Sequence, residues 1–176
     1  MIHKDIKKIL KEYFFTYPTA KLRVREMERK LKLPLPSVIR YCKELRQQGI
    51  LATEKIGDVT FYTASRSNTY LLEKKLFNIR SVYDSGLIEY LKQELSNPVI
   101  ILFGSYAKGE DTEDSDIDLY IETPSKKQVD LEKFKRLLHR EIQVFKNRSI
   151  KDIPNHHLAN NIVNGITLNN YLEVFT

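Results

Sequence analysis

The sequence predicts a mixed α/β (α+β) protein of two domains, a basic helical domain and a small sheet flanked by helices. Residues 1–66 contain short amphipathic helical patterns followed by a β-hairpin signal. Residues 98–122, PVIILFGSYAKGEDTEDSDIDLYIE, have the pattern of a buried strand, a glycine turn and a second strand. The charge also divides: residues 1–66 hold 15 Lys and Arg against 7 Asp and Glu (+8), and residues 67–176 hold 14 against 16 (−2).

The composition is that of a soluble globular protein. Of the 176 residues, 41% are hydrophobic and 30% are charged, which is ordinary for a soluble domain. No apolar run approaches the roughly 20 residues that cross a bilayer, and the first ten residues lack the apolar core of a signal peptide. The single cysteine, Cys42, excludes an internal disulfide and a Cys-rich zinc site. We therefore expect a cytoplasmic protein that does not enter a membrane.

Residues 1–66 predict three helices and a hairpin. Apolar residues recur at helical spacing over 2–15 and 22–31, and again from Pro36 to Gly49, where Val38, Cys42 and Leu45 form one stripe. A tight turn separates the second helix from the third. Residues 50–55 and 59–63 then predict two strands around Ile56-Gly57-Asp58.

This order resembles the winged helix-turn-helix family, in the run SVIRYCKELRQQGIL followed by the hairpin. The resemblance implies that the third helix enters the major groove of duplex DNA. Residues off the buried stripe would then contact DNA, namely Ser37, Arg40 and Lys43, with Lys55 in the wing. A homodimer is an expectation for this class. Winged helices also serve as protein–protein modules, so that alternative stays open.

Residues 67–97 predict a helical connector. Asn68 suits the start of one helix, and residues 85–96 predict another that Ser96-Asn97-Pro98 ends. We therefore divide the chain into a winged helix-turn-helix domain (1–66), a helical connector (67–97) and a sheet domain (98–176) whose first helix is 85–96.

The sheet domain carries a candidate metal site. In a strand over 116–121, Asp116 and Asp118 share one face and lie about 6.6 Å apart along the strand. Two such carboxylates repel each other unless a cation lies between them, and their hard oxygen ligands suit Mg²⁺ or Mn²⁺. Gly104-Ser105 follows a buried strand and opens a short helix, whose free N–H groups suit a phosphate. Together these features predict phosphoryl or nucleotidyl transfer.

The run FGSYAKGEDTEDSDIDLYIE resembles the DNA polymerase beta-like nucleotidyltransferase superfamily, and its Gly-Ser-x-Ala-x-Gly and Ser-Asp-Ile-Asp-Leu details resemble the minimal nucleotidyltransferase branch. The resemblance covers about residues 85–176. It implies that Gly104 and Ser105 contact a nucleotide triphosphate and that Asp116 and Asp118 bind two Mg²⁺ ions. Lys108 stands where the branch has Arg or Lys, and either contacts phosphate or solvates the helix.

The superfamily also uses a third carboxylate on a later strand. Residues 130–139 predict a helix and residues 141–145 a strand, with Glu141 and Gln143 on one face. Glu141 is the only carboxylate there, so we assign it the third catalytic and metal-binding role. Many active members carry Asp at this point. Glu141 therefore either supports catalysis, marks a member that binds nucleotide without efficient turnover, or is a surface residue. A last helix is predicted at about 155–164.

The sequence thus predicts an enzyme that moves a nucleoside monophosphate, AMP from ATP, onto a hydroxyl acceptor with Mg²⁺ or Mn²⁺. In the minimal branch the acceptor is often a HEPN-type partner protein in a toxin–antitoxin pair. The alternative is a DNA-binding transcriptional regulator whose nucleotidyltransferase-like domain binds nucleotide or a partner without efficient catalysis. Polymerisation or tRNA processing is a weaker third interpretation, because the chain has little room for a large domain that grips nucleic acid.

Overall fold

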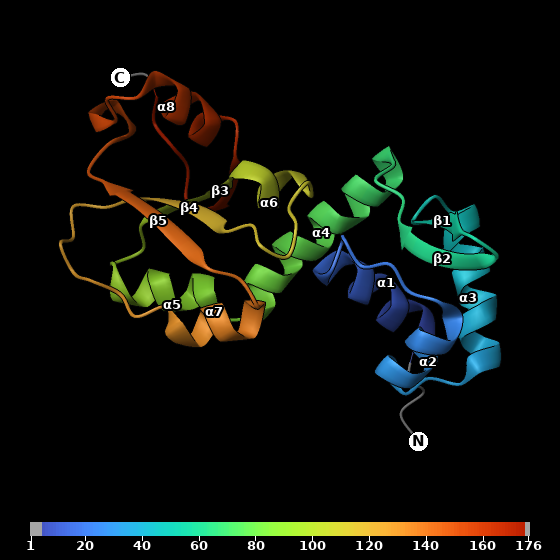
Figure 1. The fold of residues 1–176 in the computed structure, drawn as a ribbon. Helices are drawn as coiled ribbons and strands as arrows, with labels where there is room; N and C mark the ends of the chain where they lie inside the picture. The colour runs from blue at the N-terminus through green and yellow to red at the C-terminus, as the bar shows by residue number, and fades with distance from the viewer. Residues whose placement is uncertain (1–4, 175–176) are drawn as a thin grey trace. The chain divides into compact units, whose positions relative to one another are not determined.

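The computed structural model describes residues 5–174 (Figure 1). The chain divides into two compact units, one ending at Phe77 and the other beginning at Asn78. This boundary lies inside helix α4 (Asn68–Asp84). Each unit has helices, a sheet and a hydrophobic core of its own, so the predicted mixed α/β class is confirmed.

The first unit has the predicted order of three helices and a hairpin. Its elements are α1 (Ile6–Thr16), α2 (Val24–Leu31), α3 (Leu35–Gln47), β1 (Leu51–Ile56) and β2 (Val59–Ala64). Asp5 caps α1 by accepting a hydrogen bond from the backbone N–H of Lys8. The predicted start of this helix, at residue 2, lies outside the described residues. Between β1 and β2, Gly57 adopts a left-handed φ of +59°, which a two-residue hairpin turn requires.

The core of the first unit lies where the apolar periodicity of the third helix predicts it. Val38, Cys42 and Leu45 are fully buried on one face of α3. They pack with Leu10 and Phe14 of α1 in a single cluster. The opposite face of α3 is therefore the solvent face.

The second unit is built on a four-stranded mixed sheet in the order β5-β4-β3-β6. Strand β3 pairs antiparallel with both β4 and β6, whereas β4 and β5 run parallel. The strands are β3 (Val99–Phe103), β4 (Ile117–Glu122), β5 (Ile142–Asn147) and β6 (Ile166–Asn169). Around them lie α5 (Leu87–Glu94), α6 (Gly104–Lys108), α7 (Glu132–Leu138), the 3₁₀ helix η1 (Ile150–Asp152) and α8 (His156–Val163).

Helices cover both faces of this sheet. Helices α5 and α7 lie against one face and α8 against the other (Figure 1). On β4, alternate residues Ile117, Leu119 and Ile121 join the core under α5 and α7. Tyr120, which points the other way, joins the core under α8. Asp118 alternates with these residues, so its side chain lies on the α8 face.

The structure differs from the sequence prediction in details of β4, α4 and β6. The strand with the two aspartates begins at Ile117, so Asp116 lies one residue before it. Helix α4 continues through Ser81, where the sequence left a break open. Residues Ile166–Asn169 form β6, which the sequence did not predict, because four residues of mixed polarity carry too little alternation.

Within the described part of the chain, no helix combines the length and the apolar character needed to cross a membrane.

Candidate active site

Strands β3 and β4 bring Gly104 against Asp118. Phe103, the last residue of β3, is the register partner of Asp118 on β4, so the turn that follows β3 begins beside this carboxylate. Gly104 has a φ of +76°, and a Cβ added there would overlap Oδ2 of Asp118. A side chain at this position would therefore be strained by the left-handed backbone and would force the Asp118 carboxylate to move. This contact joins the Gly-Ser turn to the Asp-x-Asp strand.

The turn opens the five-residue helix α6, which ends at Lys108 and is capped by Gly109. Ser105 is half-buried in its first turn and Lys108 is exposed in its last. The backbone N–H groups at the start of a helix have no intrahelical partners. Lys108, at the other end of α6, lies away from those N–H groups.

Asp116 and Asp118 form a pair of interacting carboxylates at the start of β4. Asp116 is exposed just before β4, and Asp118 is half-buried within it. Burial raises the pKa of Asp118, and the negative charge of Asp116 raises it further. Among residues 5–174, no lysine or arginine forms an ion pair with either aspartate. The protein itself thus leaves this pair of charges uncompensated.

The pair fits one divalent cation of the Mg²⁺ type. Mg²⁺ in nucleotide sites is held by one or two carboxylates, with phosphate oxygens and waters as its other ligands. The described residues hold no group of three or more His, Cys, Asp or Glu placed to bind a metal ion. The structure therefore does not assemble the predicted trio, and a metal site on the two aspartates stays a prediction. The expectation of two ions stays a prediction.

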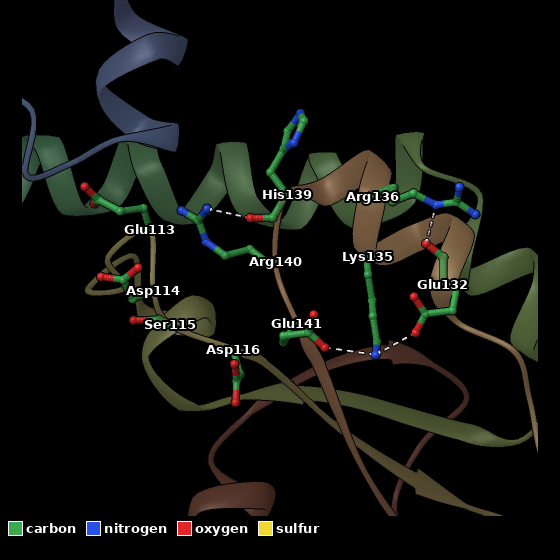
Figure 2. A pocket seen from close by; sticks show the side chains of 10 residues that line it. All are labelled: Glu113, Asp114, Ser115, Asp116, Glu132, Lys135, Arg136, His139, Arg140 and Glu141. Carbon is green, nitrogen blue, oxygen red and sulfur yellow. Dashed lines mark hydrogen bonds and ion pairs between the residues drawn. The ribbon is translucent and has the colours of Figure 1, made fainter.

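Glu141 is turned toward helix α7. Its carboxylate forms an ion pair with Nζ of Lys135 at 2.9 Å, and the same ammonium contacts Glu132 at 2.8 Å. Figure 2 shows Glu141 pointing toward Lys135, whereas Asp116 points away from it. Glu141 also lies before β5, not within it. Its role as the third carboxylate stays a prediction that this position does not support.

The residue of β5 in register with Asp118 is Gln143. Paired residues of neighbouring strands project from the same face of a sheet. The sequence placed Glu141 and Gln143 on one face of a strand but gave no means of knowing which of them lies beside Asp118. Register depends on how β4 and β5 pair, and local pattern does not fix that.

An open pocket of about 450 Å³ lies on the α7 side of this region (Figure 2). Of the predicted site residues, only Asp116 and Glu141 line it; Gly104, Ser105, Lys108 and Asp118 do not. The other lining residues are mostly charged and come from the loop before β4 and from α7 and the turn after it, namely Glu113, Asp114, Ser115, Glu132, Lys135, Arg136, His139 and Arg140. Asp116 thus lines this pocket and stands two residues before Asp118 in the sequence.

A buried polar network, missed by the sequence reasoning, supports the loop before β4. Asp111 lies 3.6 Å from the guanidinium of Arg140, and both side chains are almost fully buried. Nδ2 of Asn78 donates to Oδ1 of Asp111 at 2.7 Å and to the backbone carbonyl of Tyr106 at 2.9 Å. Nearer the aspartates, the Ser115 hydroxyl accepts from the backbone N–H of Thr112 at 2.9 Å. The sequence reasoning missed these residues because nothing in the sequence around Asp111 or Arg140 indicates that their side chains are buried.

One comparison with known proteins gives a match, and it covers most of the second unit. Residues 85–161 match the family model of the nucleotidyltransferase domain. The match includes every residue of the candidate site from Gly104 to Gln143 and supports nucleotidyl transfer as the general function of this segment. It does not extend over residues 1–84. No curated protein and no solved structure gives a significant match to the chain.

The candidate DNA-contacting residues belong to the first unit, outside the matched residues 85–161. Arg40 and Lys43 are exposed on α3, off the buried stripe, and Ser37 is half-buried. The Arg40 guanidinium stacks over the ring of Tyr41 and donates to its hydroxyl at 2.6 Å. Lys55 is exposed near the end of β1. Arg40, Lys43 and Lys55 are thus exposed and Ser37 only partly so, and contact of these residues with DNA stays a prediction.

Proposed function

We propose that the nucleotidyltransferase domain moves a nucleoside monophosphate from a nucleoside triphosphate, AMP from ATP, to a hydroxyl acceptor. The contact of Gly104 with Asp118 is the observation that carries this proposal. A glycine turn whose N–H groups suit phosphate, in contact with one carboxylate of a pair that suits a divalent ion, supports this proposal. Neither feature is specific alone, but their contact suits a nucleotide triphosphate held together with Mg²⁺ or Mn²⁺.

In this proposal each group has a defined task. Gly104 and Ser105 bind the phosphates through backbone N–H groups and the hydroxyl, and Asp116 and Asp118 hold the cation. When bound, the cation supplies positive charge against the triphosphate and the leaving pyrophosphate. The acceptor oxygen forms a bond to the α-phosphorus, and the bond from the α-phosphorus to the oxygen that bridges the α- and β-phosphates breaks. Pyrophosphate leaves with the electron pair of that bond. The hydroxyl proton passes to a carboxylate or to solvent.

The test is calorimetry with Mg²⁺ and a non-hydrolysable ATP analogue. We expect the wild-type chain to bind the Mg²⁺-analogue complex, and the Asp116→Ala/Asp118→Ala variant to bind it with an affinity at least about tenfold lower. Asp114→Ala is the matched control, because Asp114 is an exposed carboxylate of the same loop and lies two residues before Asp116. Equal affinity in the double variant would refute the metal site.

Transfer itself is tested with ATP labelled at the α-phosphate. Candidate acceptors, a HEPN-type partner protein first among them, are incubated with the wild-type chain and the double aspartate variant. Label on the acceptor that depends on both aspartates supports the enzyme.

The second candidate function is a DNA-binding regulator whose nucleotidyltransferase domain holds nucleotide or a partner protein without efficient transfer. The ion pair of Glu141 with Lys135 favours it, since this carboxylate is turned away from the aspartate pair. We propose that α3 of the first unit enters the major groove of duplex DNA, with Arg40 reading bases, Ser37 and Lys43 contacting phosphates and Lys55 in the wing. Retention on DNA together with nucleotide binding, but with no label transferred, would favour this function.

A further inference from the structure

A row of three residues crosses the sheet at the proposed site. Phe103 of β3 pairs with Asp118 of β4, and Asp118 pairs with Gln143 of β5. Neighbouring strands lie about 4.8 Å apart, and paired residues share a face, so the Gln143 side chain starts next to that of Asp118 on the α8 side. The following row supports this assignment, because Tyr120 and Phe145, two residues further along each strand, belong to the core on that same face.

Gln143 brings no charge to this row. A side-chain amide offers one oxygen and two N–H donors, whereas a carboxylate offers two charged oxygens. The nearest carboxylate of the β5 segment, Glu141, forms its ion pair with Lys135 on the α7 side. Gln143 is exposed at the edge strand of the sheet, so no packing demands an amide there. The side chain beside Asp118 is therefore free to contact a ligand and is uncharged.

We propose that Gln143 is the third side chain of the nucleotide site, beside Asp116 and Asp118. Its neutral amide keeps the affinity for the metal ion low and makes nucleotidyl transfer slow, while the nucleotide still binds. The inference rests on the proposed function. With Gln143 in place, the site holds its cation through two carboxylates and the nucleotide phosphates. The amide cannot accept the proton that leaves the acceptor hydroxyl when its oxygen bonds to the α-phosphorus and pyrophosphate departs, so that proton goes to an aspartate or to solvent.

The isosteric substitution Gln143→Glu tests this proposal without changing side-chain size. We expect Mn²⁺, measured by calorimetry and by electron paramagnetic resonance, to bind at least about tenfold more tightly to Gln143→Glu than to the wild-type chain. We also expect the variant to melt at a lower temperature in EDTA, because like charges placed directly opposite each other destabilise a sheet. Mn²⁺ should reverse that loss, and labelled transfer from ATP should rise.

Gln93→Glu is the matched control for the added charge. Gln93 is exposed on α5, which covers the other face of the sheet, so this variant should keep wild-type Mn²⁺ affinity and melting behaviour. Glu141→Gln tests the competing assignment and should also leave Mn²⁺ affinity unchanged. Loss of Mn²⁺ binding in Glu141→Gln would overturn the inference, and so would wild-type affinity in Gln143→Glu.

The outcomes separate this inference from the proposed function. If the wild-type chain binds no Mg²⁺-nucleotide, the proposed function fails. If it binds Mg²⁺-nucleotide through Asp116 and Asp118, and Gln143→Glu changes neither Mn²⁺ affinity nor melting in EDTA, the proposed function stands and only the role of Gln143 is refuted.

Discussion

At the scale of single residues, Gly104 has two separate reasons to be glycine. Its φ of +76° lies in the left-handed region, and Asp118 occupies the space that a Cβ would take. Gly86 shares the first reason, with a φ of +79°, but has no atom within 4 Å of a built Cβ. A comparison of substitutions at these two glycines therefore separates the cost of backbone strain from the cost of overlap with Asp118.

We predict that Gly86→Ala and Gly104→Ala each lose about 1–2 kcal/mol of unfolding free energy through left-handed strain. Gly104→Ala should lose more, because Asp118 must also move, and it alone should lose Mg²⁺-ATP binding. Urea unfolding and calorimetry measure both effects. Nucleotide binding retained by Gly104→Ala would show that the turn does not contact the phosphates.

The raised pKa of Asp118 predicts how the stability of the protein depends on pH. Burial and the neighbouring charge of Asp116 raise its pKa in the folded protein, so its ionised form is disfavoured relative to the unfolded chain. Below the pKa of an unfolded aspartate both states are protonated and Asp118 costs no stability. As the pH rises from the unfolded pKa to the raised folded pKa, the unfolded chain ionises first and the cost grows, and it is complete above the raised pKa.

In EDTA, Asp118→Asn should therefore unfold at a higher temperature than the wild-type chain at neutral pH, and the gain should shrink toward the acid end. Thermal melts from about pH 3 to 8 measure it, with the exposed Asp114→Asn as the control for loss of one charge. A gain that does not depend on pH would contradict the assigned cause.

At the scale of elements, the buried pair of Asp111 and Arg140 joins the loop after α6 to the segment before β5. Asn78 extends the network to α4. Removing one charge from a buried pair is costly because the remaining charge stays in a low-dielectric interior. An ion pair at the surface contributes little by comparison.

We predict that Asp111→Asn lowers the unfolding free energy by about 3 kcal/mol. Glu94→Gln, which removes a carboxylate from the surface pair with Lys127, should cost under about 1 kcal/mol. Chemical denaturation of both variants makes the comparison. Equal losses would mean that Asp111 does not support the loop that carries Asp116.

The elements that the sequence predicted well are those with a strong local signal. The α3 stripe of Val38, Cys42 and Leu45 follows from its spacing, and Gly57 marks the hairpin through its turn chemistry. The Gly-Ser turn and Asp118 followed from their distinctive spacing. The sequence did not predict that Gln143 is the neighbour of Asp118, because tertiary packing decides the register of two strands that are separated by a helix. The role of Asp111 was missed because its burial also depends on tertiary packing.

At the scale of the whole molecule, the charge is divided in sequence, with +8 over residues 1–66 and −2 over the remainder. A basic segment that binds duplex DNA releases counterions from the phosphates it neutralises, so its affinity falls with rising salt. Loss of a base contact and loss of a phosphate contact change DNA binding in different ways. Losing a phosphate contact weakens binding to every sequence alike and lowers the salt slope by about one.

We therefore predict that the full chain binds duplex DNA at low salt, and that Lys43→Ala reduces both affinity and the slope of log K against log salt by about one. Arg40→Ala should instead relax preference among sequences, because an arginine in the groove reads guanine. Lys126→Ala, an exposed lysine of the acidic part of the chain, is the control and should leave both quantities unchanged. Fluorescence anisotropy with labelled duplexes across a salt series measures all three variants. If Lys126→Ala lowers the slope as much as Lys43→Ala does, binding is non-specific attraction to the whole chain, and α3 is not the DNA-contacting element.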